Sequence, residues 1–252
     1  MKTQCILFIL LILIFSSCEK SSSDSASGDS LQPGSGKSGS MAKFSISGDN
    51  LFIINEKDLK VYNISTTTNP TEINTLEVDF GIETVFTLNG KLFIGSIDGV
   101  YIYDISNPQN ILYLSRYQHI TSCDPVVAND TLAFATLNSQ SGCRWQQGIN
   151  QLDVINIKNI VYPNLISSLN MTNPKGLAID SSYLFVCDGE MGVRIFDFSN
   201  PYQLDLISGI SGIDAYDIIL DNKILYLIGR DGLFQYNYDN IHQIQLLSNI
   251  LF

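Results

Sequence analysis

Short apolar stretches alternate with polar turns from residue 41 to residue 252. The apolar residues follow strand periodicity in runs of about four to eight, and no segment sustains helical periodicity. Clusters of Asn, Asp, Gly, Ser and Pro, which form tight turns, lie between the runs. The pattern predicts a single all-β domain of many short strands.

One module recurs five times in this region. Its clearest copies are residues 99–108 (GVYIYDISNP) and 192–201 (GVRIFDFSNP), with weaker copies at 61–70, 152–159 and 233–240. The Asp or Asn that marks the module falls at Asn63, Asp104, Asn156, Asp197 and Asn237, at intervals of 41, 52, 41 and 40 residues. Periods of about 40 to 45 residues with four short strands per copy are typical of propeller blades.

We therefore expect a β-propeller of five four-stranded blades, with an insertion in the third copy. An open β-solenoid is the alternative, although it would leave two long exposed edges. In the second copy we expect strands at 81–88, 91–96, 100–105 and 111–117. The second strands align on leucine, and their near-continuous apolar runs indicate burial on both faces. These leucines are Leu51, Leu92, Leu132, Leu184 and Leu225.

The Asp-Ile-Ser-Asn-Pro module, together with the GLAID to LFVCD stretch at 176–188, resembles the LVIVD repeat family of bacterial surface and secreted propellers. The resemblance covers essentially all of 41–252. It implies a β-propeller, and it transfers no catalytic residue to this chain.

The first seventeen residues read as a signal peptide, with Lys2 before an apolar run from Cys5 to Phe15. Eleven apolar residues are too few to span a bilayer, which needs about twenty in a helix. Ser16, Ser17 and Cys18 resemble the lipobox of bacterial lipoproteins, which implies lipidation at Cys18. An ordinary cleaved signal with a chance cysteine is the alternative.

Residues 18–40 form the expected lipidated cysteine and tether. Nine of residues 19–40 are Ser and four are Gly, a composition that cannot bury enough apolar surface to fold. The propeller would then be residues 41–252, held at the outer membrane or the cell surface. The sequence does not distinguish the periplasmic face from the exterior.

In such an oxidising compartment, Cys123 and Cys143 are placed to form a disulfide that pins the insertion across one mouth of the channel. Two free thiols are the alternative. Cys187 lies in an apolar second strand and reads as a small buried side chain.

Polar residues fall at the start of the inner strands, where propeller loops surround one mouth of the channel. These are Lys43, Glu83, Asp124, Lys175, Tyr216 and Asp217. Arg144 and Trp145, on the insertion, complete a candidate ligand-binding rim. Mixed charges beside an aromatic ring suit a small polar ligand such as a sugar, but the same residues would also serve as ion pairs between blades, with the insertion as a plug.

Candidate catalytic residues are scarce. The two histidines, His119 and His242, stand in no motif, and the sequence has no zinc spacing, calcium loop or phosphate-binding loop. The net charge of −11 argues against a nucleic-acid partner. We expect a monomeric, non-catalytic binding module without metal or cofactor, anchored to the membrane by lipid, for a protein or glycan partner. The alternative is a glycan-active hydrolase or lyase with carboxylates at the channel mouth.

Overall fold

The computed structural model describes residues 39–119, 125–139 and 149–252. The described residues all belong to one unit of the chain, Gln32–Phe252. They form twenty strands and no helix, so these residues contain no helix that could cross a membrane.

The strands form five four-stranded antiparallel sheets, each built in chain order. Blades 1 and 2 consist of β1 (Phe44–Ser47), β2 (Asn50–Asn55), β3 (Asp58–Asn63), β4 (Thr71–Glu77), β5 (Ile82–Leu88), β6 (Lys91–Ser96), β7 (Gly99–Asp104) and β8 (Leu112–Gln118). Blade 3 consists of β9 (Val126–Ala128), β10 (Leu132–Asn138), β11 (Asn150–Asn156) and β12 (Asn164–Asn170). Blades 4 and 5 consist of β13 (Leu177–Asp180), β14 (Tyr183–Cys187), β15 (Val193–Asp197), β16 (Asp205–Ile210), β17 (Ala215–Asp221), β18 (Ile224–Gly229), β19 (Gly232–Asn237) and β20 (Gln245–Leu251).

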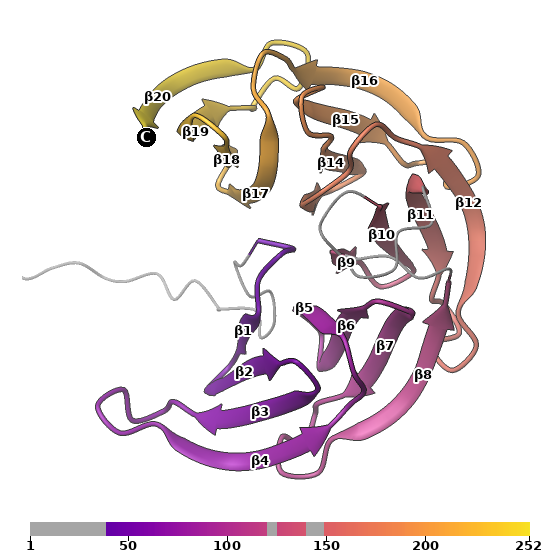
Figure 1. Ribbon diagram of the computed structural model, residues 1–252, viewed down its shortest axis with the longest axis vertical. Helices are drawn as coiled ribbons and strands as arrows, with labels where there is room; N and C mark the ends of the chain where they lie inside the picture. Colours follow the sequence, from indigo (N-terminus) through magenta and orange to yellow (C-terminus); the bar gives the residue numbers. More distant parts are fainter. Residues whose placement is uncertain (1–38, 120–124, 140–148) are drawn as a thin grey trace, which may run out of the picture. The chain divides into compact units, whose positions relative to one another are not determined.

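The described residues form a five-bladed β-propeller, as the sequence period predicts. The blades follow one another around a centre, and the first strand of each blade lies innermost (Figure 1). The strands expected in the second copy agree with β5–β8 to within one residue at each end.

The marker Asp or Asn has the same role in all five copies. Its side-chain oxygen accepts a hydrogen bond from the backbone N–H two residues later, which forms an Asx turn at the end of the third strand. These bonds are Asn63 to Ser65 (3.1 Å), Asp104 to Ser106 (2.8 Å), Asn156 to Lys158 (3.0 Å), Asp197 to Ser199 (2.7 Å) and Asn237 to Asp239 (2.9 Å). The repeat therefore conserves a turn, which fixes where the chain leaves for the outer strand.

Outer strands also tie blades 1 to 3 to the blade that follows each of them. A side chain at one position of the outer strand donates a hydrogen bond to a carbonyl just beyond the Asx turn of the next blade. These bonds are Asn74 to Pro108 (3.1 Å), Ser115 to Ile160 (2.5 Å) and Ser167 to Pro201 (2.7 Å). The connection between the third and outer strands thus also holds adjacent blades together at their rim.

Apolar clusters fill the junctions between consecutive blades. One cluster lies between blades 1 and 2, and others lie between 2 and 3, 3 and 4, and 4 and 5. Inner strands of consecutive blades also contact each other along this series, whereas no comparable contact joins β17 to β1. Among the described residues, the junction between blade 5 and blade 1 has no such cluster.

The prediction that the second strands are buried on both faces is confirmed for blades 2, 3 and 4. It is wrong for blades 1 and 5. In β2 and β18 only alternate residues are buried, because one face of each end blade has no neighbouring blade. The leucine alignment of the third copy is also shifted. Leu132 lies opposite the marker Asn156, so Ala133 takes the position that Leu92 and Leu184 take in their blades.

We predict that Phe185→Ala lowers the free energy of unfolding by about 3 to 5 kcal/mol, because it empties a fully buried site. Phe185 is 0% exposed and packs against Tyr238 with ring centroids 5.2 Å apart. The matched change Phe44→Ala, at a side chain that is 54% exposed, should cost about 1 kcal/mol or less. Chemical denaturation compares the two variants, and equal losses would contradict the assignment of the junctions.

Candidate functional site

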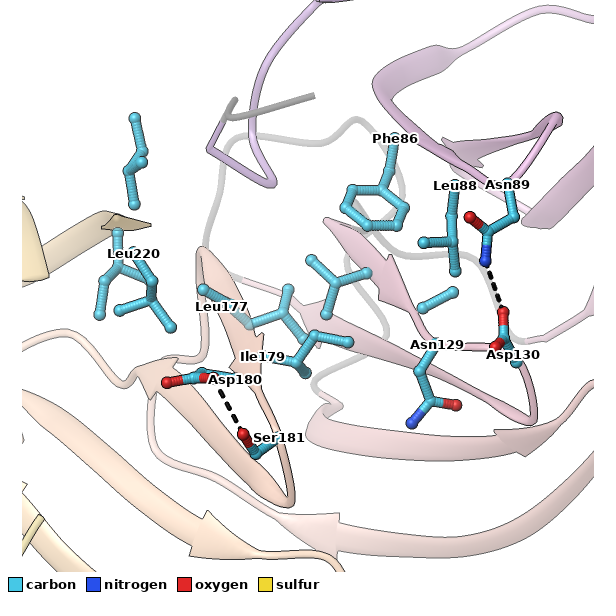
Figure 2. Close-up of a pocket in the computed structure, with 15 residues that line it drawn as sticks. Phe86, Leu88, Asn89, Asn129, Asp130, Leu177, Ile179, Asp180, Ser181 and Leu220 are labelled. Atoms are coloured by element: carbon cyan, nitrogen blue, oxygen red, sulfur yellow. Dashed lines mark hydrogen bonds between the residues drawn. The ribbon is translucent and has the colours of Figure 1, made fainter. Parts of the chain in front are cut away.

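A cavity of about 410 Å³ opens at the channel mouth where the inner strands end. Its walls come from the inner strands of blades 2 to 5 (Figure 2). Apolar side chains form most of the lining, among them Phe86, Leu177, Ile179 and Leu220. Because these strands are packed on their neighbours, the cavity is preformed, as binding sites for small molecules usually are.

Turn residues form a polar rim around this cavity. Asn89 donates a hydrogen bond to Asp130 from the next blade (2.7 Å; Figure 2). Asp180 accepts hydrogen bonds from Lys223 (2.5 Å) and Ser181 (3.1 Å). Although partial burial raises the pKa of Asp180, the bond from Lys223 and the bond from Ser181 bring it below its ordinary value. The rim therefore carries ionised carboxylates above an apolar floor.

The rim predicted from sequence lies at the opposite mouth, where the inner strands begin. There Lys43 and Glu83 share a pocket of about 460 Å³, together with Glu56 and Phe80. The pocket belongs to the junction of blades 1 and 2. The structure thus brings Lys43 and Glu83 to one pocket.

Lys175 and Tyr216 also come together, at the junction of blades 4 and 5. The Lys175 Nζ atom lies 4.0 Å from the centroid of the Tyr216 ring and 3.3 Å from Asp214 Oδ1. Asp214 also pairs with Arg230 at 2.5 Å, and Arg230 reaches Glu190 at 3.6 Å. These contacts link one blade to the next, which supports the interpretation of this part of the rim as ion pairs between blades.

Asp217 is held by the residues that precede β1. The Ser40 hydroxyl donates to Asp217 Oδ1 (3.4 Å), and the Ile218 N–H donates to the same atom (2.9 Å). Ser40 is 1% exposed, and its oxygen accepts a hydrogen bond from the Leu177 N–H (2.7 Å). Burial raises the pKa of Asp217 to about 6, although backbone N–H groups, including that of Met41, oppose the rise. A residue expected in the flexible tether is therefore part of the propeller.

Several predicted site residues lie outside the described residues. These are Cys18, Cys123, Asp124, Cys143, Arg144 and Trp145, so the predicted disulfide and its loop stay predictions. Cys187 is confirmed as a buried side chain, and burial raises the pKa of its thiol well above the ordinary value.

Sequence reasoning missed the cavity at the far mouth. A signal for it was present, because polar turn pairs follow the inner strands at Asn89-Gly90, Asn129-Asp130 and Asp180-Ser181. Because the blades repeat, these turns all lie at the same end of the channel. What the sequence could not show was which end would combine an apolar lining from four blades with a polar rim.

The described residues contain no group of three or more His, Cys, Asp or Glu side chains that could hold a metal ion. Glu83 lines a pocket of blades 1 and 2 that does not include Asp217, and Asp217 is engaged by Ser40. The geometry suits recognition of a ligand with an apolar body and polar groups at one end.

No protein-family model matches the sequence, and no curated protein matches it. Solved structures do match. A functionally unknown protein from Desulfotomaculum acetoxidans aligns with a TM-score of 0.67 at 11% identity, over 83% of this chain and 69% of that chain. A protein from Lactobacillus plantarum aligns with a TM-score of 0.62 at 16% identity, over 81% and 68%. The periplasmic gluconolactonase of Pseudomonas aeruginosa aligns with a TM-score of 0.62 at 12% identity, over 81% and 69%.

This chain thus spans little more than two thirds of these longer chains, and it spans 60% of the computationally designed protein Ika8. At these identities the likeness shows the fold and carries no activity.

We predict that Asp217→Asn stabilises the protein at neutral pH. The raised pKa of about 6 means that the folded state binds a proton more tightly than the unfolded chain, whose carboxyl has a pKa near 3.9. The Asp217 carboxyl does not lower the free energy of unfolding below about pH 4. Its destabilising effect develops between about pH 4 and pH 6 and stays constant above that, at no more than about 3 kcal/mol. Denaturation at about pH 4 and pH 7 should show a gain for Asp217→Asn only at the higher pH. The control Asp205→Asn, at an exposed outer strand, should show no such pH dependence; the same behaviour in both variants would refute the assignment.

Proposed function

We propose that this protein is a lipid-anchored protein of the cell envelope whose propeller binds a small amphipathic ligand without catalysis. The observation that carries the proposal is the apolar cavity with its polar rim at the mouth where the inner strands end. Its volume of about 410 Å³ falls within the range of about 300 to 1,000 Å³ that is usual for ligand sites.

The lining favours a ligand with an apolar body. Phe86 is the one aromatic residue among those that line the cavity, so the lining has little of the ring surface on which sugars stack. At the rim, the carboxylates of Asp130 and Asp180 accept hydrogen bonds. Hydroxyl or amine groups at one end of a ligand would find acceptors there.

The proposed anchoring rests on sequence. The apolar run that ends at Phe15, followed by Ser16, Ser17 and Cys18, resembles a lipoprotein signal, and the Ser/Gly-rich segment after it suits a tether. The resemblance of the repeats to the LVIVD family of bacterial surface propellers agrees with this location. A lipidated Cys18 would hold the propeller near the membrane surface.

The hydrolase alternative has less support. Glycosidases place two carboxyl groups about 5 to 9.5 Å apart across one substrate. The described carboxylates of the predicted rim are engaged separately, Glu83 in a pocket with Lys43 and Asp217 with Ser40. We therefore favour binding over catalysis at this mouth.

Replacing Ile179 by lysine should abolish ligand binding, because a charged chain would fill the apolar floor. We would screen a panel of small amphipathic molecules by thermal unfolding of residues 32–252. A true ligand at about 100 times its Kd should raise the Tm by roughly 5 to 10 °C, and the rise should disappear in Ile179→Lys. The matched control Ile166→Lys changes a half-buried residue that packs on the same cluster but lies outside the cavity, and it should keep the rise. A panel without any hit, or equal shifts in both variants, would contradict the proposal.

Cys18→Ala should release the protein from the membrane. In cells that express the full chain, a radiolabelled or clickable fatty acid should label the wild type and not the variant, and the variant should move to the soluble fraction. Cys5→Ala, within the expected signal peptide, is the control and should leave labelling intact. Label that persists in Cys18→Ala would show that another residue carries the lipid, and a wild type without label would contradict the lipid anchor.

A further inference from the structure

A second hollow, of about 440 Å³, lies between blades 3 and 4 on the side where the inner strands end. We call it the blade 3–4 groove. It adjoins the apolar cavity, because Asn129 and Ser181 line both. Its other walls come from the ends of the second and third strands and from the connections to the outer strands. The groove therefore follows the junction outward from the channel mouth.

The junction of blades 3 and 4 is open where its two neighbours are bridged. Between blades 2 and 3, Asn89 donates a hydrogen bond to Asp130 (2.7 Å), and between blades 4 and 5, Lys223 donates one to Asp180 (2.5 Å). In the part of the chain that the structure describes, no side-chain hydrogen bond joins the turn after β9 to the turn after β13. The polar groups of these turns are thus left for a ligand.

Two asparagines present their amide NH2 groups. The Asn129 Oδ1 atom accepts hydrogen bonds from two backbone N–H groups of its own turn, 2.8 and 2.9 Å away. The Asn156 Oδ1 atom accepts one from the Lys158 N–H, at 3.0 Å. Because backbone donors fix the oxygen of each amide, the NH2 group is turned away from the turn and available as a donor. Figure 2 shows the Asn129 side chain directed away from Phe86, which lines the apolar cavity.

Lys158 makes the groove favourable for an anion. The residues that line the groove, all of them described, include this one cation and no Asp or Glu. Lys158 is exposed, and it makes no ion pair with any residue that the structure describes. Asp130 and Asp180 line the apolar cavity instead and accept hydrogen bonds across their own junctions. On a chain of net charge −11, the groove is a local site of the opposite sign.

An aromatic ring and two hydroxyl groups complete the groove. Tyr202 lines it and is 75% exposed, so its ring offers an apolar surface that a ligand can cover. Ser182 and Ser199 also line the groove, and their hydroxyl groups can both donate and accept hydrogen bonds. An exposed ring beside amides and hydroxyl groups suits a sugar, whose ring has an apolar face and a hydroxyl edge.

We infer that the blade 3–4 groove binds a carbohydrate that bears a carboxylate, such as an acidic sugar unit of a glycan. The carboxylate accepts charge-assisted hydrogen bonds from Lys158 and Asn156, which belong to one turn. The sugar hydroxyl groups bond to Asn129 and Ser182, and the sugar ring covers Tyr202. The volume of about 440 Å³ lies within the usual range of ligand sites, about 300 to 1,000 Å³. This site does not depend on the ligand proposed for the apolar cavity.

A glycan array tests the class of ligand, with protein purified from cells that express the full chain. The array would hold glycans that contain uronic or sialic acids, each beside its neutral, carboxyl-reduced form. At least one acidic glycan should bind about 10-fold or more tightly than its neutral form, and its affinity should fall as salt is added. An array without any bound acidic glycan, or equal binding of the neutral forms, would overturn the inference.

Two lysine variants locate the carboxylate. Lys158→Ala should weaken binding of the best acidic glycan about 10-fold or more, because it removes the charged donor. The matched control Lys57→Ala removes the same charge from an exposed side chain of blade 1 that pairs only with the exposed Glu77, and it should leave the affinity unchanged. Isothermal titration calorimetry compares the two. Equal affinities in both variants would overturn the assignment of the anion to this groove.

Two tyrosine variants locate the sugar ring. Tyr202→Ala should weaken binding about threefold or more, because the apolar contact with the sugar is lost. Tyr162 is also 75% exposed but does not line the groove, so Tyr162→Ala should bind like the wild type. A loss of the same size in both variants, or in neither, would contradict the placement of the sugar against Tyr202.

Discussion

The structure depends on one contact that is repeated from blade to blade. An aromatic ring on one face of a second strand packs against aliphatic side chains of the next blade. Phe52, Phe93 and Phe185 make this contact and are almost fully buried. Because each strand alternates its side chains between two faces, a blade that receives a ring on one face presents a ring on the other. The packing therefore propagates along the chain, and it leaves one unpaired face at each end.

The same contact produces the two mouths of the channel. It aligns the inner strands side by side and in one direction, so their first residues gather at one mouth and their last residues gather at the other. At the first mouth the charged side chains neutralise each other across blades, as Lys175 and Asp214 do at 3.3 Å. At the second mouth, turn residues surround apolar strand ends and leave a cavity of about 410 Å³. Binding is thus favoured at the mouth where apolar strand ends from four blades meet a polar rim.

The sequence predicted the fold well because the repeat encodes local structure. The marker residues Asp104 and Asp197 form the turns that their spacing predicts, and the strands of the second copy agree with the structure. The sequence predicted burial wrongly where burial depends on whether another blade packs against the strand. Periodicity shows that Leu51 and Ile53 share a face, but it cannot show whether a blade covers that face. Leu132 misled the alignment because the insertion hides the register, which is set by pairing with Asn156. The cavity depends on the spacing of four strands, which no single segment encodes.

The most direct test of this account is hydroxyl-radical footprinting of the propeller in dilute solution. Mass spectrometry would compare the oxidation of Phe44 and Tyr226, on the unpaired faces of blades 1 and 5, with that of Phe52 and Phe185, which are aromatic residues at junctions assigned as filled. The account predicts that Phe44 and Tyr226 react several-fold faster than the other two. Protection of Phe44 equal to that of Phe52 would show that the ring closes on itself, and it would contradict the unpaired faces on which the account rests.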